Sequence, residues 1–314
     1  MKRVGIPRAL CYYEYAALWR AFLETLGLEV VVSPPTTRAM VTAGLQRMVA
    51  ETCLPVKVYA GHVCYLRDAG VDYVLIPAIR ATEPGLFHCS KFLGLPDLIR
   101  AVVEECPPIL EMDVDIGKKR RDLQAVIREL GKTLTWKPWQ LDAAIQAAWR
   151  AHLDYQQQRA TLYLPRPPRD DKDTRATIAV VGHPYMLYDS YITHNVLGRL
   201  QRLGVRVVTP EMAPADGLND GIIRLTGRKY WVYEGEVTGA AGYYLNQPEV
   251  DGVVVMVAFG CGPDSTMLDV AQRAARQQHK PLMSLVLDEH TGVAGLATRL
   301  EAFVDMLTRQ RRGA

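Results

Sequence analysis

The chain contains an internal repeat that limits the folds open to it. The segment VGIPRALCYYEYAALWRAFLETLGLEVVVSP from Val4 aligns without a gap with VGHPYMLYDSYITHNVLGRLQRLGVRVVTP from Val181. Each copy predicts a β-branched strand, a Gly-x-Pro break, an amphipathic helix, a glycine stop and a second strand. Strand–helix–strand units need parallel strands joined by right-handed crossovers. The repeat therefore predicts an α/β fold with two similar doubly wound, Rossmann-like halves.

Further apolar runs complete the two halves. Residues 73–79, 253–259 and 282–287 predict strands, and their nearly continuous apolar character predicts cover on both faces. Residues 123–130 and 139–155 predict helices between the halves. The second helix is expected to place four residues on one face: Trp139, Ala143, Ala147 and Leu153.

The stretch PRPPRDDKD at residues 165–173 has the prolines and charges of a linker. We therefore predict an N-terminal α/β domain at residues 1–117 and a C-terminal α/β domain at residues 174–314. A helical segment and the linker, residues 118–173, are expected between them. A cleft between the two sheets is the expected place for a cofactor.

Composition indicates an ordinary globular protein. The 314 residues include 49% hydrophobic and 23% charged residues, with a formal net charge of +3. The basic clusters Lys118–Arg121 and Arg309–Arg312 predict solvated helix ends, so we expect neither nucleic acid nor a membrane as a partner. The start MKRVGIPRAL has no apolar core, so no signal peptide is expected and a cytoplasmic location is predicted. Six thiols in a reducing compartment argue against a disulfide framework, and the absence of a CxxC pair argues against a zinc ribbon.

Three cysteines lie where an open α/β sheet binds ligands, beyond the carboxyl ends of its strands. Cys261 follows the strand at 253–259 between Gly260 and Gly262, directly before a helical stretch. Cys89 follows the strand at 73–79, and Cys53 precedes Leu-Pro at a break in a helical region. If the halves face each other, all three thiols converge in the cleft.

Convergent thiolates in a reducing compartment bind metal, and three soft sulfurs favour zinc or an iron–sulfur cluster. A [4Fe-4S] cubane on three cysteines leaves one iron open. The two glycines would let backbone amides approach such an anion at the helix start. Lys57 is a candidate cation beside the cluster, and His62 and Ser265 are candidate hydrogen-bond donors.

Each cysteine taken alone is better explained as a small buried apolar residue than as a ligand. That interpretation is preferred for Cys11 and Cys64, among helical apolar residues, and for Cys106, before Pro107 and Pro108. For the other three cysteines, spacing alone leaves ligation and packing open.

Several motifs together resemble a known family along nearly the whole chain. They are GIPRALCYYEYAALW, ETCLPVKVYAGHV, KFLGLPD, VGHPY, FGCGPDS and LDEHTGVAGLATRLEAFVD. The chain resembles the acyl-CoA dehydratase activase-related proteins, which are grouped with the 2-hydroxyacyl-CoA dehydratase and double-cubane cluster proteins. The resemblance implies a cysteine-ligated iron–sulfur cluster, with Cys53, Cys89 and Cys261 at the positions of its cluster cysteines.

The resemblance also implies a partner, an ATPase of the actin and sugar-kinase type that delivers low-potential electrons. This chain shows no P-loop pattern and no GxGxxG fingerprint of its own. It departs from the family in two places. Ser90 follows Cys89 where proline is usual, and Ala78 replaces an arginine that is common after Ile-Pro. Both departures change residues around the expected ligands, and the ligand cysteines themselves are present.

Other polar residues have simpler explanations. Asp288, in Asp-Glu-His, is interpreted as a cap of the next helix rather than as an acid–base group. His183 and His194 have no ligand spacing and are interpreted as polar surface. Glu234 and Glu236 are either a carboxylate pair in the cleft or surface turn residues. Tyr12–Tyr15 is interpreted as one face of an amphipathic helix.

Three functions remain open at this point. The first is an iron–sulfur electron-transfer or reductase component that passes a low-potential electron to a small substrate. The second is a noncatalytic cluster carrier or scaffold, and the third is a zinc-binding or metal-free α/β binding protein. The iron–sulfur component has one further variant, a double-cubane cluster. It would form within the chain, or between this chain and a second copy or a related second subunit. The substrate and a CoA site are not indicated by any residue.

Overall fold

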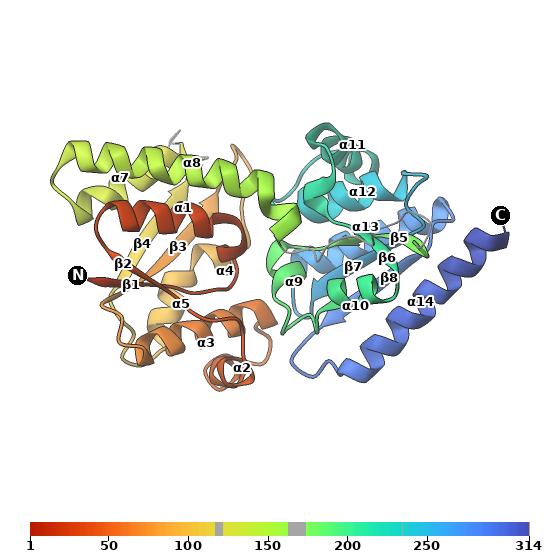
Figure 1. The fold of residues 1–314 in the computed structure, drawn as a ribbon, viewed down its shortest axis with the longest axis horizontal. Coiled ribbons are helices and arrows are strands. Elements are labelled where there is room, and N and C mark those ends of the chain that lie inside the picture. The colour runs from red at the N-terminus through yellow and green to blue at the C-terminus, as the bar shows by residue number, and fades with distance from the viewer. Residues whose placement is uncertain (117–121, 163–173, 234, 314) are drawn as a thin grey trace. The chain divides into compact units, whose positions relative to one another are not determined.

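The chain forms two compact units, Met1–Gln158 and Arg159–Ala314, called unit 1 and unit 2 below. The computed structural model describes residues 1–116, 122–162, 174–233 and 235–313 (Figure 1). Each unit is built on one four-stranded parallel sheet. The α/β fold class predicted from the repeat is confirmed. The predicted linker at residues 165–173, the basic cluster Lys118–Arg121 and Glu234 lie outside the described residues.

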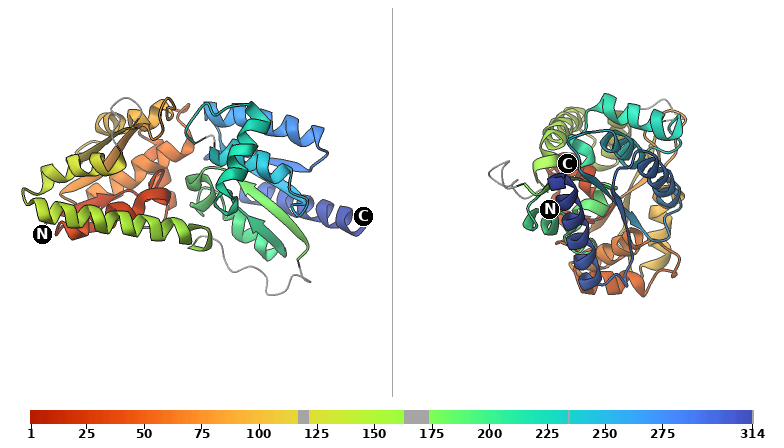
Figure 2. Two further views of the ribbon diagram at one scale, coloured as in Figure 1. Left: turned by 90° about the horizontal axis from the view of Figure 1, so that it is seen from above. Right: turned by 90° about the vertical axis from the view of Figure 1, so that its right-hand side faces the viewer.

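Unit 1 has the strand order β2-β1-β3-β4, and each neighbouring pair is parallel. Its strands are β1 (Arg3–Ile6), β2 (Glu29–Val32), β3 (Tyr73–Ala81) and β4 (Ile109–Asp115). Its helices are α1 (Tyr12–Thr25), α2 (Arg38–Leu45), α3 (Leu54–Asp68), α4 (Ser90–Leu93), α5 (Leu95–Val102), α7 (Leu123–Leu134) and α8 (Pro138–Leu162), whose end belongs to unit 2. Helices cover both faces of the sheet (Figures 1 and 2).

Unit 2 repeats this topology with the order β6-β5-β7-β8, again all parallel. Its strands are β5 (Ala176–Val181), β6 (Val205–Val208), β7 (Gly252–Ala258) and β8 (Leu282–Leu287). Its helices are α9 (Pro184–Tyr188), α10 (Val196–Arg202), α11 (Ala215–Thr226), α12 (Ala240–Leu245), α13 (Gly262–Gln277) and α14 (Val293–Gly313). Short helical turns occupy Pro210–Met212 and Gly235–Gly239. In the described ranges no helix has the length and apolar character needed to cross a membrane.

The two copies of the repeat differ in their helix. The first copy contains the single helix α1, as predicted, whereas the second contains the two short helices α9 and α10. The Asp189 side chain accepts hydrogen bonds from the Tyr191 and Ile192 backbone amides, at 3.0 and 3.4 Å, in competition with helical bonding. His194 and Asn195 adopt left-handed backbone angles, with φ of 50° and 54°. The predicted single helix in the second copy is therefore wrong.

Strand burial follows position in the sheet. All residues of β7 are buried, and β3 is buried except near its ends, as expected for central strands. The strand β8 differs, because Leu282 to Ser284 are only half-buried and Val286 is 46% exposed. Cover on both faces was thus wrong for β8, which is an edge strand of the sheet in the described chain.

The buried face of α8 also differs from the expected one. Trp139 is 66% exposed, whereas the apolar side chains that pack inward are Leu141, Ala144, Ile145 and Ala148. These four follow the i, i+3, i+4, i+7 spacing of a helix stripe. At 3.6 residues per turn, the four predicted residues point to the opposite side of α8 from these four, so the predicted face was wrong.

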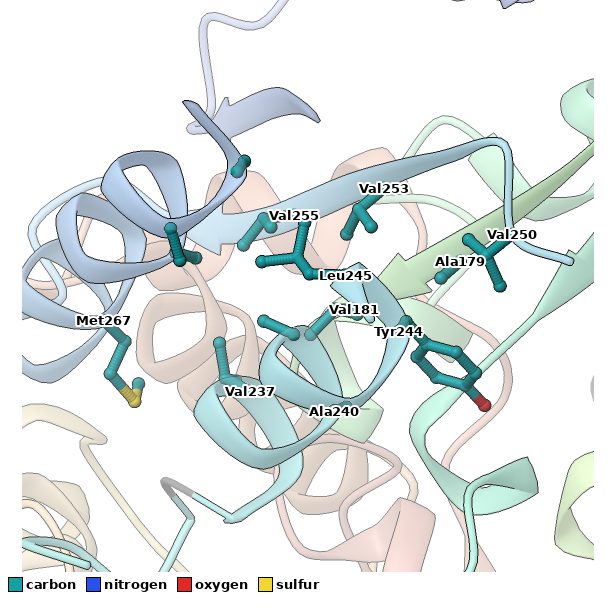
Figure 3. Close-up of a cluster of buried hydrophobic side chains, with 14 of the residues drawn as sticks. Ala179, Val181, Val237, Ala240, Tyr244, Leu245, Val250, Val253, Val255 and Met267 are labelled. Atoms are coloured by element: carbon teal, nitrogen blue, oxygen red, sulfur yellow. The ribbon is translucent and has the colours of Figure 1, made fainter. Parts of the chain in front are cut away.

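The core of unit 2 fixes two segments that matter for the site. A buried apolar cluster joins β5 and β7 to α12, α13 and the turn Gly235–Gly239 (Figure 3). Val237 in that turn and Met267 on α13 are both almost fully buried in this cluster. Because these anchors are packed, the residues beside them, Glu236 and Asp264, have defined positions.

Candidate functional site

Three cysteines lie at helix starts on the carboxyl side of the sheets. In each unit the parallel strands end at one edge, and the following helices begin there. Cys53 is the N-cap of α3, Cys89 follows β3 as the N-cap of α4, and Cys261 follows β7 as the N-cap of α13. The breaks at Cys53 and Cys261 were predicted from neighbouring proline and glycine, whereas Cys89 was predicted only to lie in the loop after β3. All three side chains are partly exposed, and none forms a disulfide.

The Cys261 turn depends on its two glycines in different ways. Gly260 has φ of 76°, a left-handed angle that an L side chain adopts at a cost. Gly262 begins α13, and a methyl group added there would meet no atom within 4 Å. The Ser265 hydroxyl donates to the Cys261 carbonyl at 2.8 Å, and the Ser265 amide donates to the same oxygen at 3.1 Å. The Ser265 side chain thus closes the first turn of α13.

The start of α3 is held by close packing against α2. A Cβ atom at Gly44 would lie 1.8 Å from the Lys57 carbonyl oxygen, and one at Gly61 would lie 1.9 Å from the Met40 carbonyl oxygen. Only glycine permits two helix backbones to approach this closely. The buried Lys57 ammonium donates to the Ala50 carbonyl at 2.9 Å, in the turn that precedes Cys53. This hydrogen bond from Lys57 stabilises the turn that precedes Cys53.

His62 is a structural link within unit 1. Its ring nitrogens lie 2.8 Å from the Ser33 hydroxyl and 2.9 Å from the Thr36 hydroxyl, both in the loop after β2. Burial, together with the nearby Arg8 charge, lowers the pKa of His62 to about 4. The imidazole is therefore neutral near pH 7, and both of its nitrogens are already engaged.

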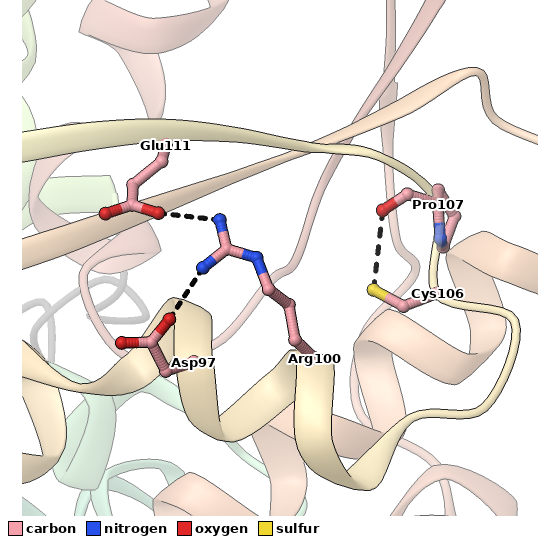
Figure 4. Close-up of polar contacts among 5 residues, drawn as sticks. All are labelled: Asp97, Arg100, Cys106, Pro107 and Glu111. Carbon is pink, nitrogen blue, oxygen red and sulfur yellow. Dashed lines mark hydrogen bonds and ion pairs between the residues drawn. The ribbon is translucent and has the colours of Figure 1, made fainter.

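The other three cysteines have different surroundings. Cys11 and Cys64 are buried, and burial raises the pKa of Cys64. Cys11 is the N-cap of α1, rather than a residue inside that helix. The partly exposed Cys106 lies at the amino end of β4, where its thiol donates to the Pro107 carbonyl at 3.4 Å (Figure 4). Burial also raises the pKa of Cys106. Burial fits the packing role predicted for Cys11 and Cys64, whereas Cys106 is only partly buried.

A salt-bridge cluster lies near Cys106 in unit 1. Arg100 on α5 donates to Asp97 and to Glu111, each at 2.7 Å (Figure 4). Both carboxylates raise the pKa of Arg100, most strongly through the Glu111 hydrogen bond. The pairs are largely exposed, so their contribution to stability is small.

Unit 2 holds a buried charge cluster that the sequence interpretation missed. His183, at the end of β5, is 3% exposed, and its Nε2 lies 2.7 Å from Oδ1 of Asp264. Its Nδ1 faces Oε2 of Glu236 at 3.7 Å. Burial by itself lowers the pKa of His183, but the Asp264 and Glu236 carboxylates outweigh it and raise the pKa to about 10. The prediction of His183 as polar surface was wrong.

A sequence signal for this cluster did exist. His183 occupies the repeat position of Ile6, which is a buried apolar residue in unit 1. A polar residue at the buried end of a strand needs a polar partner. The partner Asp264 lies three residues after Cys261, within the motif used to identify the site. Glu236 is 21% exposed at its side chain, so its alternative as a simple surface turn residue is also wrong.

The remaining polar candidates have local roles. His194 Nε2 lies 2.9 Å from the Thr291 carbonyl oxygen. Because a carbonyl oxygen can only accept, His194 Nε2 is the donor of this hydrogen bond. Asp288 accepts from the His290 amide at 3.0 Å and the Thr291 hydroxyl at 2.8 Å. Because α14 begins only at Val293, Asp288 stabilises a turn and is not the predicted helix cap. The tyrosines from Tyr12 form the first turn of α1, as predicted.

The predicted cluster ligands are divided between the units. Cys53 and Cys89 belong to unit 1, and Cys261 belongs to unit 2. Among the described residues, no three or more His, Cys, Asp or Glu side chains are arranged to hold a metal ion. The convergence of the three thiols stays a prediction, because it depends on how the two units meet.

Comparison with protein families adds a match over most of the chain. Residues 3–213 match the model of the CoA enzyme activase uncharacterised domain (DUF2229). The chain belongs to this CoA enzyme activase domain family. The matched region of this family member contains Cys53, Cys89 and His183 and ends before Cys261. The match thus covers nearly all of unit 1 and about the first third of unit 2.

Other comparisons with this family member give little. No curated protein sequence matches it. Among solved structures, a glucosamine-6-phosphate deaminase from Thermotoga maritima is similar at 9% sequence identity, with a TM-score of 0.21, over 99% of this chain and 86% of that chain. A likeness at that level carries no argument about fold or activity.

Proposed function

We propose that this protein is an iron–sulfur protein of the 2-hydroxyacyl-CoA dehydratase-like type. Cys53, Cys89 and Cys261 would hold one [4Fe-4S] cluster between the two units. The protein would accept low-potential electrons from an ATPase of the actin and sugar-kinase type and pass them to a small substrate. Membership of the CoA enzyme activase domain family supports the general class.

One observation carries the proposal. The three cysteines that the family resemblance marks as ligands are partly exposed N-caps of helices that begin at the carboxyl edges of the sheets. Of the remaining cysteines, Cys11 and Cys64 are buried, and Cys106 lies at the amino end of β4. A ligand set needs accessible thiolates, and helix N-termini favour bound anions.

The donor chemistry fits the implied group. Three thiolates suit an iron–sulfur cluster, although they also suit zinc. When bound, a [4Fe-4S] cluster with three protein ligands supplies one-electron chemistry and an iron that is open to a further ligand. The residues of the chain would hold and orient it. The helix starts at the three cysteines would present backbone amides, and the Ser265 bond to the Cys261 carbonyl would keep the α13 turn closed.

The first experiment is anaerobic purification with measurement of iron, acid-labile sulfide and zinc. We expect a brown protein with about four irons per chain. Cys53→Ser, Cys89→Ser and Cys261→Ser should each lower the bound iron strongly. Cys106→Ser is the matched control, because Cys106 is also partly exposed but lies at the other end of the sheet. Equal iron in the Cys261 and Cys106 variants, or zinc without sulfide, would refute the proposal.

A second experiment separates an electron-transfer role from a noncatalytic carrier. A reduced ATPase of the actin and sugar-kinase type is mixed with the cluster-loaded protein. Reduction of the cluster is then followed by electron paramagnetic resonance. ATP-dependent reduction supports electron transfer. Loading without reduction, together with cluster transfer to an apo acceptor, would favour the carrier function instead. Size-exclusion chromatography with light scattering under the same conditions tests whether a homodimer or a second subunit is involved.

A further inference from the structure

The buried charge cluster of unit 2 connects two neighbouring strand ends. His183 follows β5 and is the N-cap of α9, while Asp264 lies in the first turn of α13, which follows β7. The strands β5 and β7 are paired in the sheet. The 2.7 Å contact between His183 Nε2 and Asp264 Oδ1 therefore links the turn after one strand to the helix that follows its neighbour.

The Asp264 carboxylate is directed into unit 2 rather than to solvent. The N-cap residue Cys261 makes no side-chain capping hydrogen bond, and the Asp264 side chain, in the first turn of α13, is almost fully buried with Oδ1 on His183 Nε2. Acidic residues in a first helical turn ordinarily stay at the surface and interact with the helix dipole. The Asp264 carboxylate is instead bonded to His183, so it connects the first turn of α13 to the turn that follows β5.

The histidine is itself held from several sides. Its ring stacks on Tyr185 with centroids 5.1 Å apart and lies 5.4 Å from the ring of Tyr233. Glu236 faces the second ring nitrogen and is placed by the buried Val237 beside it. Among the described residues, the His183 ring is hydrogen-bonded through Nε2 alone, and on its other sides it is packed against two aromatic rings and faces a carboxylate, so a change of rotamer would break these contacts.

We propose that His183, through Asp264, is a positioning residue that holds Cys261 in place for its ligand. Asp264 lies one helical turn after Cys261, and the Ser265 amide and hydroxyl both bond to the Cys261 carbonyl. Movement of Asp264 would therefore open the turn that carries the thiol. The expected effect of His183 on a bound cluster rests on the proposed function. Its expected effect on the position of the Cys261 turn does not.

The test compares two substitutions at one site. His183→Gln keeps an amide nitrogen near the position of Nε2 and can still donate to Asp264, whereas His183→Leu cannot. His194→Gln is the matched control, since His194 is another hydrogen-bonded histidine of unit 2 that bonds to Thr291. The first readout is hydrogen–deuterium exchange in the metal-free full chain, comparing the peptide at 261–268 with peptides from β5 and β7.

In His183→Leu we expect exchange at 261–268 to rise by about tenfold more than exchange in β5 and β7. His183→Gln should restore most of the protection, and His194→Gln should resemble wild type. Exchange that rises evenly through unit 2, or not at all at 261–268, would overturn the inference. If His183→Leu does not fold, Glu236→Gln is used, and a smaller local rise at 261–268 is expected. Unchanged exchange there would also overturn it.

The second readout is iron release from the loaded protein to a chelator, with the electron paramagnetic resonance spectrum of the reduced state. His183→Leu should release iron about tenfold faster than His183→Gln. A wild-type protein without iron or sulfide, but with the local exchange difference, would refute the proposed function and leave the positioning role intact. Bound iron in wild type with identical release from both variants would refute the role of His183 at the cluster.

Discussion

Units 1 and 2 share a sheet topology but stabilise their cysteine-bearing edges by opposite means. Unit 1 uses neutral groups, with the buried His62 between two hydroxyls and a glycine crossing of α2 and α3. Unit 2 uses charge, with His183 between two carboxylates. Both histidines are buried, yet the pKa is lowered to about 4 in His62 and raised to about 10 in His183. Burial favours the neutral form, and only adjacent carboxylates reverse that preference.

The comparison also separates two ways of placing a helix start. In unit 1 the backbones of α2 and α3 touch, so the position of α3 is determined by shape. In unit 2 the first turn of α13 is placed by one charge-assisted hydrogen bond and by Met267 in the core. The packing of α2 against α3 does not depend on pH, whereas the strength of the His183–Asp264 hydrogen bond does. The following predictions test this contrast, beginning with the largest expected effect.

Removing the charge from the unit 2 cluster should have the largest effect on stability. We expect His183→Leu to destabilise unit 2 by about 4 kcal/mol near pH 7, because Asp264 is left buried without its cationic partner. The contribution of the imidazolium is complete below the pKa of an unfolded histidine, about 6.5, and is lost as the pH rises through about 10.

Urea unfolding of the full chain at several pH values measures this loss. Exchange in β5 and β7 rises with the shared loss of stability, and the excess at 261–268 over that rise is the local effect of the positioning role. The difference between wild type and His183→Leu should shrink as the pH rises from about 7 to above 10. A difference that does not change with pH would show that His183 acts by shape alone, which would remove the contrast between the units.

The glycine crossing in unit 1 should give the next largest effect. In Gly61→Ala the new methyl group would overlap the Met40 carbonyl, and the backbones must separate. We expect a loss of about 3 kcal/mol in the free energy of unfolding of unit 1. Gly295→Ala in α14 is the control, because a methyl group there meets nothing within 4 Å and alanine favours a helix. Similar stability in both variants, measured by urea unfolding, would contradict the close crossing.

His62 should make unit 1 sensitive to acid, in the opposite direction from His183. Its pKa is lowered in the folded state, so its contribution is present above about pH 6.5 and is lost as the pH falls toward 4. Between about pH 7 and pH 5 we expect unit 1 to lose about 2 kcal/mol. His62→Gln should flatten this dependence, and exchange of the α3 amides reports it. An unchanged slope in that variant would assign the acid sensitivity to another group.

The two glycines beside Cys261 should give the smallest and most local difference. Gly260→Ala should cost about 1 kcal/mol because residue 260 has a left-handed φ. Gly262→Ala should have almost no effect, since its position is open and begins a helix. Thermal unfolding of the two variants, measured side by side, tests the geometry of the turn. Equal melting temperatures would mean that the left-handed angle is not required.

Much of the fold could be predicted because the pattern was local. Gly27 and Gly204, the Gly-x-Pro breaks and the apolar runs at β3 and β7 mark element ends and central strands without reference to the rest of the chain. Predictions failed where neighbours decided the outcome. The position of β8 at the sheet edge leaves Val286 exposed, and the Asp189 side chain divides a helix into α9 and α10.

The candidate site shows the same division. Glycine and proline neighbours were enough to place Cys53 and Cys261 at helix starts. Cys89 was expected only in the loop after β3, and the short helix α4 that begins beside it was not predicted. The sequence could not show that His62 has no nitrogen left for a ligand, or that His183 and Asp264, 81 positions apart, are bonded. These facts depend on long-range pairing across β5 and β7.

The amino-acid order alone determined that this protein has two parallel α/β sheets and that three thiols stand at their carboxyl edges, because strand and helix starts follow from local conformational preference. Only the tertiary structure decided which polar side chains are charged and which are neutral. The same residue type, buried in both units, takes a proton where two carboxylates from distant segments surround it and loses one where hydroxyls do.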